Sequence, residues 1–495
     1  MTYTLAHYFA DAKLNYCPDW AHNIPLPNPP YKHQIGDLNH LATFTRAGLL
    51  NDPGTGKTRP IQAYGLWLVA QGNKVVYLMP PVLLQQFQQS FKATYPGYEH
   101  HVDIAIINAP PIKRQQLIDA WDKTKWPELM VMSYRMFVQY HKLLLEKNYT
   151  CAIVDEATAV KNSSSQLHKA VKGFAGSIKD SNGLVLLTGT AIETNPADAY
   201  GIIALLNPLR YGSKKSFERL HISFAHLGSS NIKIVTGYKN FEYLRASLFT
   251  NSRRVQKSDC LDLPPRIIAE IPITLSDKHL KLYKQGVDER LAEVNGEMLD
   301  LTTASALYQF TQRVLMCPEK YTDTPPKDNN LVSAIDTLLD SLTGHKVIIY
   351  VWYQGSVEKL AERYKKLNPA LLYGKTKDRE QQRQQFITDP TCRILIANVR
   401  SGGVGVDQLQ HVSSHAIFAE ICPFPGAFYQ AIDRLHRSGQ KADKVTAYLL
   451  VPLQTVAIKL RNNLVQKDFQ QELIMKDKRT VLIDLLGDAG LVGKF

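Results

Sequence analysis

The sequence lacks the features of a membrane-spanning, secreted or zinc-binding protein. Its apolar runs are short and interrupted by proline, as in KVVYLMPPVLL at 74–84, so none is long enough to span a bilayer. The amino terminus, MTYTLAHYFADAKLNYC, has no apolar core of the kind found in signal peptides. Only six of the 495 residues are cysteine, and none form a CxxC motif or a cluster at zinc-ligand spacing. We therefore expect a cytoplasmic protein with free thiols and no membrane partner.

Acidic residues are fewer than basic ones. The chain has 58 Lys and Arg against 45 Asp and Glu, which gives a formal net charge of +13 and a pI near 9.2. This balance permits a polyanionic partner such as nucleic acid, although many basic proteins bind none. At 495 residues the chain exceeds the usual size of one domain, so we expect two or three domains.

The sequence does contain a repeated alternation of short β-branched runs and helical stretches. Runs that are apolar on both faces and alternate with helices are typical of buried parallel strands in βαβ units. They occur in two groups, at 74–80, 129–134, 151–156 and 183–190, and again at 346–353, 393–399, 415–421 and 444–451. The pattern predicts an α/β protein with two tandem parallel-sheet lobes.

The stretch between the two groups differs in kind. From about 195 to 330 it has Leu, Lys, Tyr and Glu at helical spacing, and the paired prolines of DTPPKDNN (323–330) make the best linker candidate. After residue 452 the pattern is helical and charged. We therefore divide the chain into an N-terminal extension (1–28), a first lobe with a helical protrusion (29–260), a helical protrusion with a linker (261–330), a second lobe (331–453) and C-terminal helices (454–495).

The segment NDPGTGKT at 51–58 has the glycine, lysine and threonine pattern of a phosphate-binding loop. Gly54 and Gly56 let backbone amides wrap a β-phosphate, and Lys57 neutralises β- and γ-phosphate oxygens. Thr58 is placed to hold Mg²⁺ through its hydroxyl. Asn51 stands where the general pattern has its first glycine, and a glycine turn without a ligand is the alternative interpretation. The nucleotide-binding residues predicted in this loop also include Asp52, Pro53 and Thr55.

A second acidic motif follows the apolar run in CAIVDEAT. Asp155 and Glu156 end this run about 100 residues after the phosphate-binding loop, a plausible distance for another strand of the same sheet. Asp155 is predicted to hold Mg²⁺, and Glu156 is predicted to polarise the attacking water as a general base. The alternative is that Asp155 only caps the next helix.

The second lobe supplies positive charge in QAIDRLHRSGQ at 430–440. Arg434 and Arg437 are three residues apart, on one face of a helical segment that begins after CPFPG. This face would present two guanidiniums to ATP, as an arginine finger does. A solvated basic helix is the alternative.

These segments resemble, in order along the chain, the Swi/Snf-type branch of the superfamily-two helicases and DNA translocases. PPYKHQ resembles the adenine-reading element, with Gln34, and DEATAVKNSSS resembles the DEAH box. Other matching segments are VMSYRMF (motif Ib), LLTGTAIETN (motif III), RRVQKSDCLDLPPR (the arginine-containing segment before the second lobe), KVIIYVWYQGSVEKL (motif IV), NVRSGGVGVDQL (motif V) and QAIDRLHRSGQ (motif VI). The resemblance covers about residues 29 to 470 and is that of a compact bacterial or phage form.

The resemblance implies two RecA-like lobes that sandwich ATP and Mg²⁺ and move the protein along double-stranded DNA, including forked or branched DNA. It further implies a monomer acting on DNA in the cytoplasm of a bacterial or phage-infected cell. A motor that moves through any sequence must rely on phosphate contacts. The implied DNA contacts are Ser133, Tyr134, Lys161, Asn162 and Arg400, and motif V adds Gly405 and Asp407 to the nucleotide-binding residues.

The sequence departs from the family pattern at a few positions. Thr158 stands where the family usually has His, and Ala191 stands where proline is common. In motif V, Asn398 and Val399 replace a Ser-Thr pair, and Asp407 replaces an Asn. The side chain of valine cannot hydrogen-bond a phosphate. These changes therefore put DNA binding, and the coupling of ATP hydrolysis to movement along DNA, in doubt. None of them touches the residues predicted for the ATP chemistry.

Three functions are compatible with this pattern. The first is an ATP-dependent translocase on duplex DNA that remodels forks or displaces bound proteins. The second is a strand-separating or branch-migrating helicase, which needs a wedge that the sequence does not display. The third is a nucleotide-gated DNA-binding module whose ATPase activity has decayed, and the intact Lys57, Asp155, Glu156, Arg434 and Arg437 argue against it.

Overall fold

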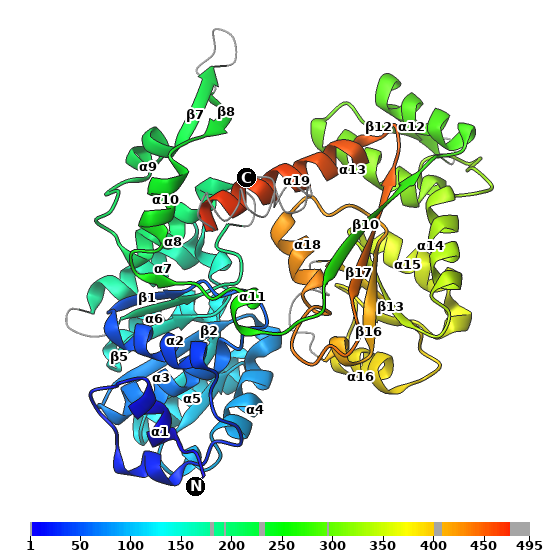
Figure 1. Ribbon diagram of the computed structural model, residues 1–495. Helices are drawn as coiled ribbons and strands as arrows, with labels where there is room; N and C mark the ends of the chain where they lie inside the picture. Colours follow the sequence, from blue (N-terminus) through cyan, green and yellow to red (C-terminus); the bar gives the residue numbers. More distant parts are fainter. Residues whose placement is uncertain are drawn as a thin grey trace, which may run out of the picture. The chain divides into compact units, whose positions relative to one another are not determined.

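The chain folds into two units, each built around one parallel β-sheet (Figure 1). A computed structural model describes residues 2–178, 183–192, 195–226, 233–294, 297–399 and 408–475. Unit 1 comprises residues 1–261 together with the chain from 470, and unit 2 comprises residues 262–469. The predicted fold class, an α/β protein with two parallel-sheet lobes, is confirmed.

The sheet of unit 1 has seven strands in the order β3-β4-β2-β5-β6-β1-β9, and every neighbouring pair is parallel. The strands are β1 (Arg46–Leu49), β2 (Lys74–Met79), β3 (Ile104–Ile107), β4 (Leu129–Ser133), β5 (Tyr149–Val154), β6 (Leu184–Leu187) and β9 (Ser252–Arg253). Because the sheet is parallel throughout, the carboxyl ends of all its strands lie at one edge. The loops that follow β1, β5 and β6 therefore meet there.

Helices cover both faces of this sheet, which is why its strands are apolar on both sides. Along β2, Val75 and Tyr77 enter one core while Val76 and Leu78 enter the other. The first core is completed by α1 (Leu5–Asp11), α2 (Lys32–Thr43), α3 (Thr58–Ala70) and α4 (Leu84–Thr94). The second is completed by α6 (Tyr134–Glu146), α7 (Gln166–Ser177), α8 (Ala199–Leu206) and α10 (Phe241–Leu248). Unit 1 also contains α5 (Pro111–Lys123), α9 (Lys214–His221), α11 (Lys257–Cys260) and the antiparallel strands β7 (Ile222–His226) and β8 (Lys233–Tyr238).

Unit 2 repeats the plan with a six-stranded parallel sheet in the order β10-β17-β16-β13-β15-β14. Its strands are β10 (Arg266–Ile273), β13 (Lys346–Val351), β14 (Ala370–Leu372), β15 (Ile394–Asn398), β16 (Ser413–Phe418) and β17 (Val445–Pro452). Its helices are α12 (Asp277–Glu289), α13 (Ala304–Met316), α14 (Asn330–Ser341), α15 (Gln354–Arg363), α16 (Arg379–Thr388) and α18 (Pro425–Ile432), with α19 (Val456–Met475) leading out of the unit. A hairpin of β11 (Leu291–Val294) and β12 (Glu297–Asp300) lies between α12 and α13.

Two features of the predicted helical segment at 261–330 need correction. Residues 266–273 form β10, the edge strand of the second sheet, which pairs along its whole length with β17. The strand was missed because it has only one neighbour and most of its residues are exposed, so its apolar pattern is weak.

The second correction concerns 323–330, which is not a linker between the units. Pro326 is buried, and the segment joins two helices of the same core. Asn329 fixes the turn: its side-chain oxygen accepts from the backbone N–H of Leu331 at 3.1 Å, and its amide donates to the carbonyls of Leu315 and Met316 at 3.1 Å. The prolines therefore shape a capped turn, and the division between units falls at 261/262.

Two expectations drawn from composition can be compared with the structure. All six cysteines are free thiols. Among the described residues, no helix combines the length and the apolar character needed to cross a bilayer.

Gly65 allows α3 to lie directly on β2. A Cβ at this position would stand 1.8 Å from the hydroxyl oxygen of Tyr77, which is fully buried. We expect Gly65→Ala to lower the free energy of unfolding by roughly 1–3 kcal/mol, because overpacking outweighs the helix propensity gained. Gly173→Ala in α7 is the matched control, since nothing lies within 4 Å of its Cβ position. Denaturant unfolding should show this control to be as stable as the parent or more so, and equal stability of the two variants would contradict the packing argument.

Candidate nucleotide-binding site

The loop at 50–57 connects β1 to the N-terminus of α3. Gly54 and Gly56 have φ of 86° and 80°, a backbone region that favours glycine, and they turn the loop back over the start of the helix. Asn51 and Thr55 are buried, whereas Thr58 is exposed at the first helical position. The free N–H groups and the dipole of α3 at this end favour an anion such as a phosphate.

Lys57 lies across the loop rather than pointing into solvent. Its Nζ donates to the backbone carbonyls of Asn51 at 2.8 Å and Asp52 at 3.2 Å. Burial lowers the pKa of Lys57, while the negative charges of Glu156 and Asp155 oppose that change. The ammonium is therefore held in place within the electrostatic field of the two acids.

The two acids stand in the turn after β5, one strand away from β1 across β6. The N–H of Asp155 donates to the carbonyl of Leu78 at 2.8 Å, which extends the sheet to the turn itself. Glu156 then adopts a left-handed backbone, with φ of 50°, and its N–H donates to Oδ1 of Asp155 at 3.0 Å. Burial raises the pKa of Asp155, the neighbouring charge of Glu156 raises it further, and Lys57 lowers it. The structure thus brings Lys57, Asp155 and Glu156 together.

The loop after β6 touches the phosphate-binding loop. A Cβ on Gly189 would lie 2.6 Å from Cγ of Pro53, so this glycine is required for the close approach of the two loops. Thr158 follows the acids, and its hydroxyl donates to the carbonyl of Glu156 at 3.4 Å. Ala191 is fully buried. The loop after β6 carries motif III. Motif III therefore contacts the loop that is predicted to hold the phosphates.

Gln34 is tied to the same loop. Its amide donates to the carbonyl of Gly56 at 3.1 Å, and its side-chain oxygen accepts from the N–H of Tyr31 at 3.0 Å. A ring nitrogen of His33 lies 2.8 Å from the carbonyl of Thr55. These contacts place the residue beside the loop, and its contact with adenine stays a prediction.

Asp37, which belongs to no motif predicted from the sequence, also holds the loop in place. Asp37 in α2 is 1% exposed, and its carboxylate accepts from the side-chain amide of Asn51 at 2.7 Å and from Nε of Arg253 at 3.0 Å. Burial raises the pKa of Asp37, and Arg253 opposes this. The sequence signal for this contact is Asn51. It stands where the general loop pattern has a glycine, and its side chain can therefore form a contact that glycine could not.

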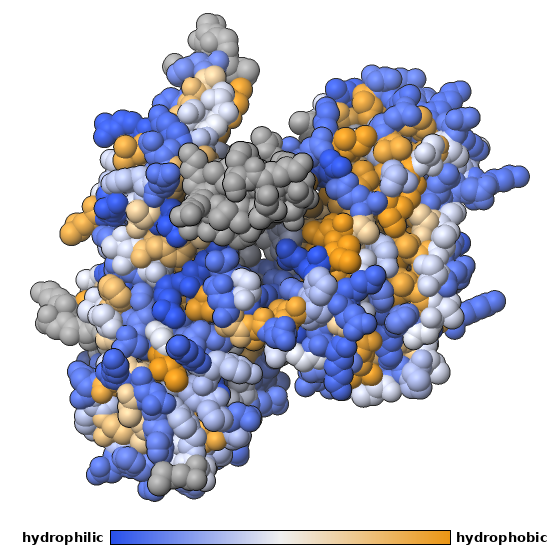
Figure 2. All heavy atoms as spheres, viewed as in Figure 1, coloured by the Kyte–Doolittle hydropathy of each residue, from blue (hydrophilic) through white to orange (hydrophobic). Residues whose placement is uncertain are grey.

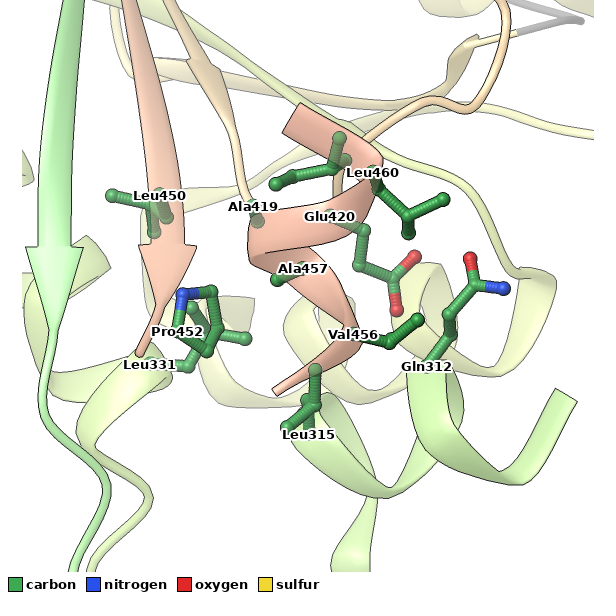
Figure 3. Close-up of a pocket in the computed structure, with 11 residues that line it drawn as sticks. Gln312, Leu315, Leu331, Ala419, Glu420, Leu450, Pro452, Val456, Ala457 and Leu460 are labelled. Atoms are coloured by element: carbon green, nitrogen blue, oxygen red, sulfur yellow. The ribbon is translucent and has the colours of Figure 1, made fainter. Parts of the chain in front are cut away.

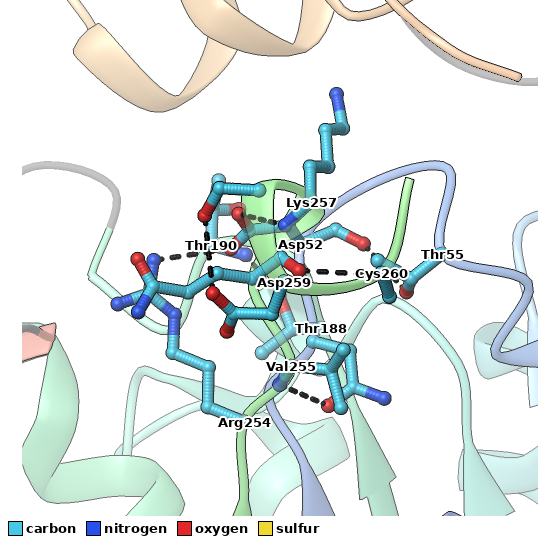
Figure 4. Close-up of polar contacts among 12 residues, drawn as sticks. Asp52, Thr55, Thr188, Thr190, Arg254, Val255, Lys257, Asp259 and Cys260 are labelled. Carbon is cyan, nitrogen blue, oxygen red and sulfur yellow. Dashed lines mark hydrogen bonds and ion pairs between the residues drawn. The ribbon is translucent and has the colours of Figure 1, made fainter. Parts of the chain in front are cut away.

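A second set of polar contacts joins the loop at 50–57 to residues 254–257, the segment that leads out of unit 1 (Figure 4). The carboxylate of Asp52 accepts from Arg254 at 3.0 Å through Oδ1 and from the N–H of Lys257 at 3.2 Å through Oδ2. The N–H of Val255 donates to the side-chain oxygen of Asn51 at 2.9 Å, and the N–H of Asp52 donates to the carbonyl of Val255 at 2.9 Å. The carboxylate and the N–H of Asp52 are therefore both bonded within the protein and anchor the loop, and the nucleotide contact predicted for this residue stays a prediction.

The residues predicted to contact DNA in unit 1 all have structural partners. Ser133 is 8% exposed and caps α6 by accepting from the N–H of Met136 at 3.4 Å. The hydroxyl of Tyr134 donates to the carbonyl of Asp155 at 2.6 Å, which supports the acidic turn. Lys161 lies 3.4 Å from a carboxylate oxygen of Asp198.

Asn162 is the exposed member of this group. Its side-chain oxygen accepts from the N–H of Ser164 at 3.0 Å and from the hydroxyl of that residue at 2.7 Å. Contact of these four residues with DNA stays a prediction, and burial makes Ser133 the least accessible of them.

The expected helical face of motif VI is not formed. The helix α18 ends at Ile432, and Arg434 and Arg437 lie in the turns that follow. The backbone forms tight turns there, with the N–H of Leu435 donating to the carbonyl of Ile432 at 2.9 Å. The side chain of Leu435 is fully buried. The Nε of Arg437 donates to the carbonyl of Asp433 at 3.3 Å, and both arginines are half-buried.

Motif V is described only at its start. Asn398 donates through its side chain to the carbonyl of Trp352, and Val399 is 1% exposed. A buried valine has no surface for a phosphate, in keeping with the expected loss of that contact. Arg400, Gly405 and Asp407 lie outside the described residues.

Unit 2 contains a pocket that is too small for a nucleotide (Figure 3). It has a volume of about 20 Å³, roughly that of one water, and is lined mainly by apolar residues with Gln312 and Glu420. The buried Glu420 carboxylate accepts from the N–H groups of Trp352 and Tyr353 at 2.6 and 2.9 Å and from Ser356 Oγ at 2.6 Å. Burial raises the pKa of Glu420, and these bonds oppose the change. Its role is to hold the start of α15.

A larger and more basic pocket lies beside the start of α15. It measures about 470 Å³ and is lined by Arg313, Lys320, Lys375 and Glu358 together with Trp352, Tyr353 and Asn398. The N-terminus of α15 adds the positive end of a helix dipole. This pocket could not be predicted from the sequence, because its cations come from three separate segments of the chain.

Comparisons with known proteins identify the family of the chain. Residues 34–321 match the SNF2-related domain, and residues 330–439 match the helicase conserved C-terminal domain. The chain belongs to the SNF2-related family. The resemblance found in the sequence and the predicted enzyme class, a helicase-like ATPase, are confirmed.

Relatives of this SNF2-related chain include bacterial and eukaryotic proteins. An uncharacterised ATP-dependent helicase of Mycoplasma genitalium is 23% identical, with 86% of this chain and 40% of the relative covered. The ISWI chromatin-remodelling complex ATPase of Saccharomyces cerevisiae is also 23% identical, with 91% of this chain and 41% of the relative covered. The chain thus spans about two fifths of the length of these relatives. The SWI2/SNF2 ATPase core of Sulfolobus solfataricus, solved in complex with double-stranded DNA, is 20% identical over 94% of this chain and 97% of that chain, with a TM-score of 0.41.

Removal of the Asp37 carboxylate should loosen the phosphate-binding loop. Asp37→Ala leaves the amide of Asn51 without its acceptor, so we expect the free energy of unfolding to fall by roughly 1–3 kcal/mol. ATP binding should weaken as well, because Asn51 also holds Lys57. Glu99→Ala is the control, since Glu99 forms a surface ion pair with Lys92 at 3.7 Å and its loss should cost less than about 1 kcal/mol. Unfolding and nucleotide titration would measure both, and equal effects of the two substitutions would remove Asp37 from this role.

Proposed function

We propose that the protein is an ATP-dependent double-stranded DNA translocase. The observation that carries the proposal is the meeting of Lys57, Asp155 and Glu156 at one edge of a parallel sheet, in a chain of the SNF2-related family. These residue types at this place are those that phosphoryl transfer from a nucleotide requires. The proposed role of ATP hydrolysis is to move the protein along the DNA backbone and so remodel forks or displace bound proteins.

In the first step the loop binds the phosphates of ATP. Lys57 exchanges its bonds to the carbonyls of Asn51 and Asp52 for phosphate oxygens, and the N–H groups at the start of α3 donate to the same group. The Thr58 hydroxyl and the Asp155 carboxylate are hard oxygen donors of the kind that Mg²⁺ prefers, and Mg²⁺ would supply positive charge to the phosphate oxygens. Because burial and Glu156 raise the pKa of Asp155, its carboxyl is protonated more readily than an exposed one.

In the second step Glu156 accepts a proton from the attacking water. Its left-handed backbone turns the residue out of the line of β5, directly after the carboxylate of Asp155. Arg434 and Arg437 are proposed to stabilise the charge that develops on the γ-phosphate. The turns in which they lie place two guanidiniums close together in the chain, although not on one helical face.

Duplex DNA is the proposed partner of the motor. The excess of Lys and Arg permits a polyanionic partner, and the pocket lined by Arg313 and Lys320, in which Lys375 is paired with Glu358 at 2.7 Å, is proposed to accept a backbone phosphate. Asn162 and Lys161 are the best placed of the predicted contacts in unit 1. We propose that the protein acts as a monomer in the cytoplasm, and that forked DNA is among its substrates.

Two other functions are weaker candidates. A nucleotide-gated binding module without ATPase activity is disfavoured because Lys57 and both acids are present and held in place. A strand-separating or branch-migrating helicase differs from a translocase only in what happens at a fork. The distinction needs a direct measurement of strand release.

Glu156→Gln tests the proposed chemistry. The amide keeps the size of the side chain but accepts no proton, so DNA-stimulated ATP turnover should fall by roughly 10²- to 10⁴-fold while ATP still binds. Glu99→Gln serves as the control, because Glu99 is on the surface and far along the chain from the acids. Steady-state ATPase assays with and without duplex DNA provide the measurement. Turnover within a few-fold of the parent would rule out Glu156 as the general base.

Translocation and unwinding can be separated with two substrates. We expect the parent protein with ATP to displace the third strand of a triplex and to leave the strands of a simple fork paired, because tracking rests on backbone contacts. Lys57→Ala should do neither, which controls for passive displacement. Efficient release of a strand from the fork would favour the helicase instead.

A further inference from the structure

The hairpin of β7 and β8 projects from unit 1 beyond α9 (Figure 1). Its base is fixed by His221, whose ring nitrogens lie 2.9 Å from the hydroxyl of Tyr211 and 3.2 Å from the carbonyl of Lys239. The side-chain amide of Asn240 donates to the carbonyl of Leu220 at 2.6 Å. The rings of Phe217 and Tyr243 pack against His221. The hairpin therefore stands on a buried aromatic base.

Beyond this base the hairpin exposes apolar side chains on both of its faces. Phe224 is 38% exposed, Ile234 is 44% exposed and Val235 is 45% exposed. Hydrophobic (orange and pale) atoms are visible on the projecting hairpin in Figure 2. A two-stranded ribbon gains little stability from such residues when no core covers them. Contiguous exposed apolar groups on a projecting element are typical of a binding surface.

The pairing register separates the two faces. Phe224 pairs with Val235 and His226 pairs with Lys233, so these four side chains share one face, while Ile234 pairs with Ala225 on the other. On the first face the Nζ of Lys233 lies 5.7 Å from the centre of the Phe224 ring. An aromatic ring beside a cation is the arrangement on which a nucleic-acid base stacks while its phosphate is neutralised.

The charge around the hairpin favours a polyanion. The two strands contain no Asp or Glu and contain Lys233, while Glu218 and Glu242 lie in the helices at the base of the hairpin. A protein partner with an apolar surface would not require this absence of acids. A DNA strand benefits from it directly, because each phosphate carries a negative charge.

We propose that the face of the hairpin formed by Phe224, His226, Lys233 and Val235 binds the unpaired bases of branched or tailed DNA. Paired bases in a duplex are already stacked on each other, so a duplex offers phosphates to the lysine but no free base for the ring. Unpaired nucleotides can place a base on the ring of Phe224 and a phosphate beside Lys233. The inference rests on the proposed function in that DNA is the partner, and it deepens that proposal by assigning a site for single-stranded segments at a branch point.

The test compares Phe224→Ala with Ile234→Ala, two truncations of similarly exposed side chains on opposite faces. Binding to a labelled duplex with a single-stranded tail and to a blunt duplex is measured by fluorescence anisotropy at fixed salt. Phe224→Ala should weaken binding to the tailed DNA by roughly five-fold or more, and Phe224→Trp should restore it because a ring is present again. Neither variant should change binding to the blunt duplex, and Ile234→Ala should behave as the parent on both substrates.

Three outcomes would overturn the proposal. One is binding of tailed DNA by Phe224→Ala that is as tight as that of the parent. Another is equal weakening of binding by both truncations, which would indicate no preference for the face. Light scattering that shows a loss of self-association in Phe224→Ala would assign the face to a second copy of the chain. The anisotropy assay needs no ATP, so it remains informative if the parent shows no DNA-stimulated ATPase activity and the translocase proposal fails.

Discussion

The anchoring of the phosphate-binding loop is the constraint on which the rest of unit 1 depends. The loop contains two glycines with positive φ. Ordering a glycine costs more backbone conformational entropy than ordering any other residue, so such a loop needs other contacts to hold one conformation. The loop is held in one conformation by carboxylates at two points, Asp37 below it and Asp52 within it. Asp37 reaches the loop through Asn51, and Asp52 is bound by the chain segment at 254–257. The position of Lys57 follows, because the carbonyls that it binds belong to Asn51 and Asp52.

The same contacts connect the nucleotide site to the path of the chain. The segment at 253–257 runs beside the loop with backbone bonds at Leu50 and Asp52, and the chain leaves unit 1 only a few residues later, at 261. Lys57 is bonded to the carbonyls of Asn51 and Asp52, and both of these residues are bonded to this segment. The loop at 50–57 and the segment that leads out of unit 1 are therefore parts of one hydrogen-bonded network.

Several residues predicted from motifs serve the structure as well as the proposed chemistry. Tyr134 supports the acidic turn through the carbonyl of Asp155, and Gln34 holds the carbonyl of Gly56. Such double use is expected where a site is built on loops, since each side chain near the reacting group must itself be fixed. In the projecting β7–β8 hairpin, by contrast, Phe224, Ile234 and Val235 are exposed.

The sequence by itself determined the α/β class, the eight strands expected in two groups and the order of the motifs, because buried parallel strands are apolar on both faces and phosphate-binding loops need glycines next to a lysine. It could not reveal β10, whose exposed edge position weakens its pattern, or the true end of α18, which depends on the burial of Leu435. The contacts of Asp37, Arg253 and Arg254 could not be predicted either, although both arginines lie in a segment recognised from its sequence, because their partners are 14 to more than 200 residues away along the chain. Only the tertiary structure decided these contacts, because a buried carboxylate is stable only where folding supplies its donors.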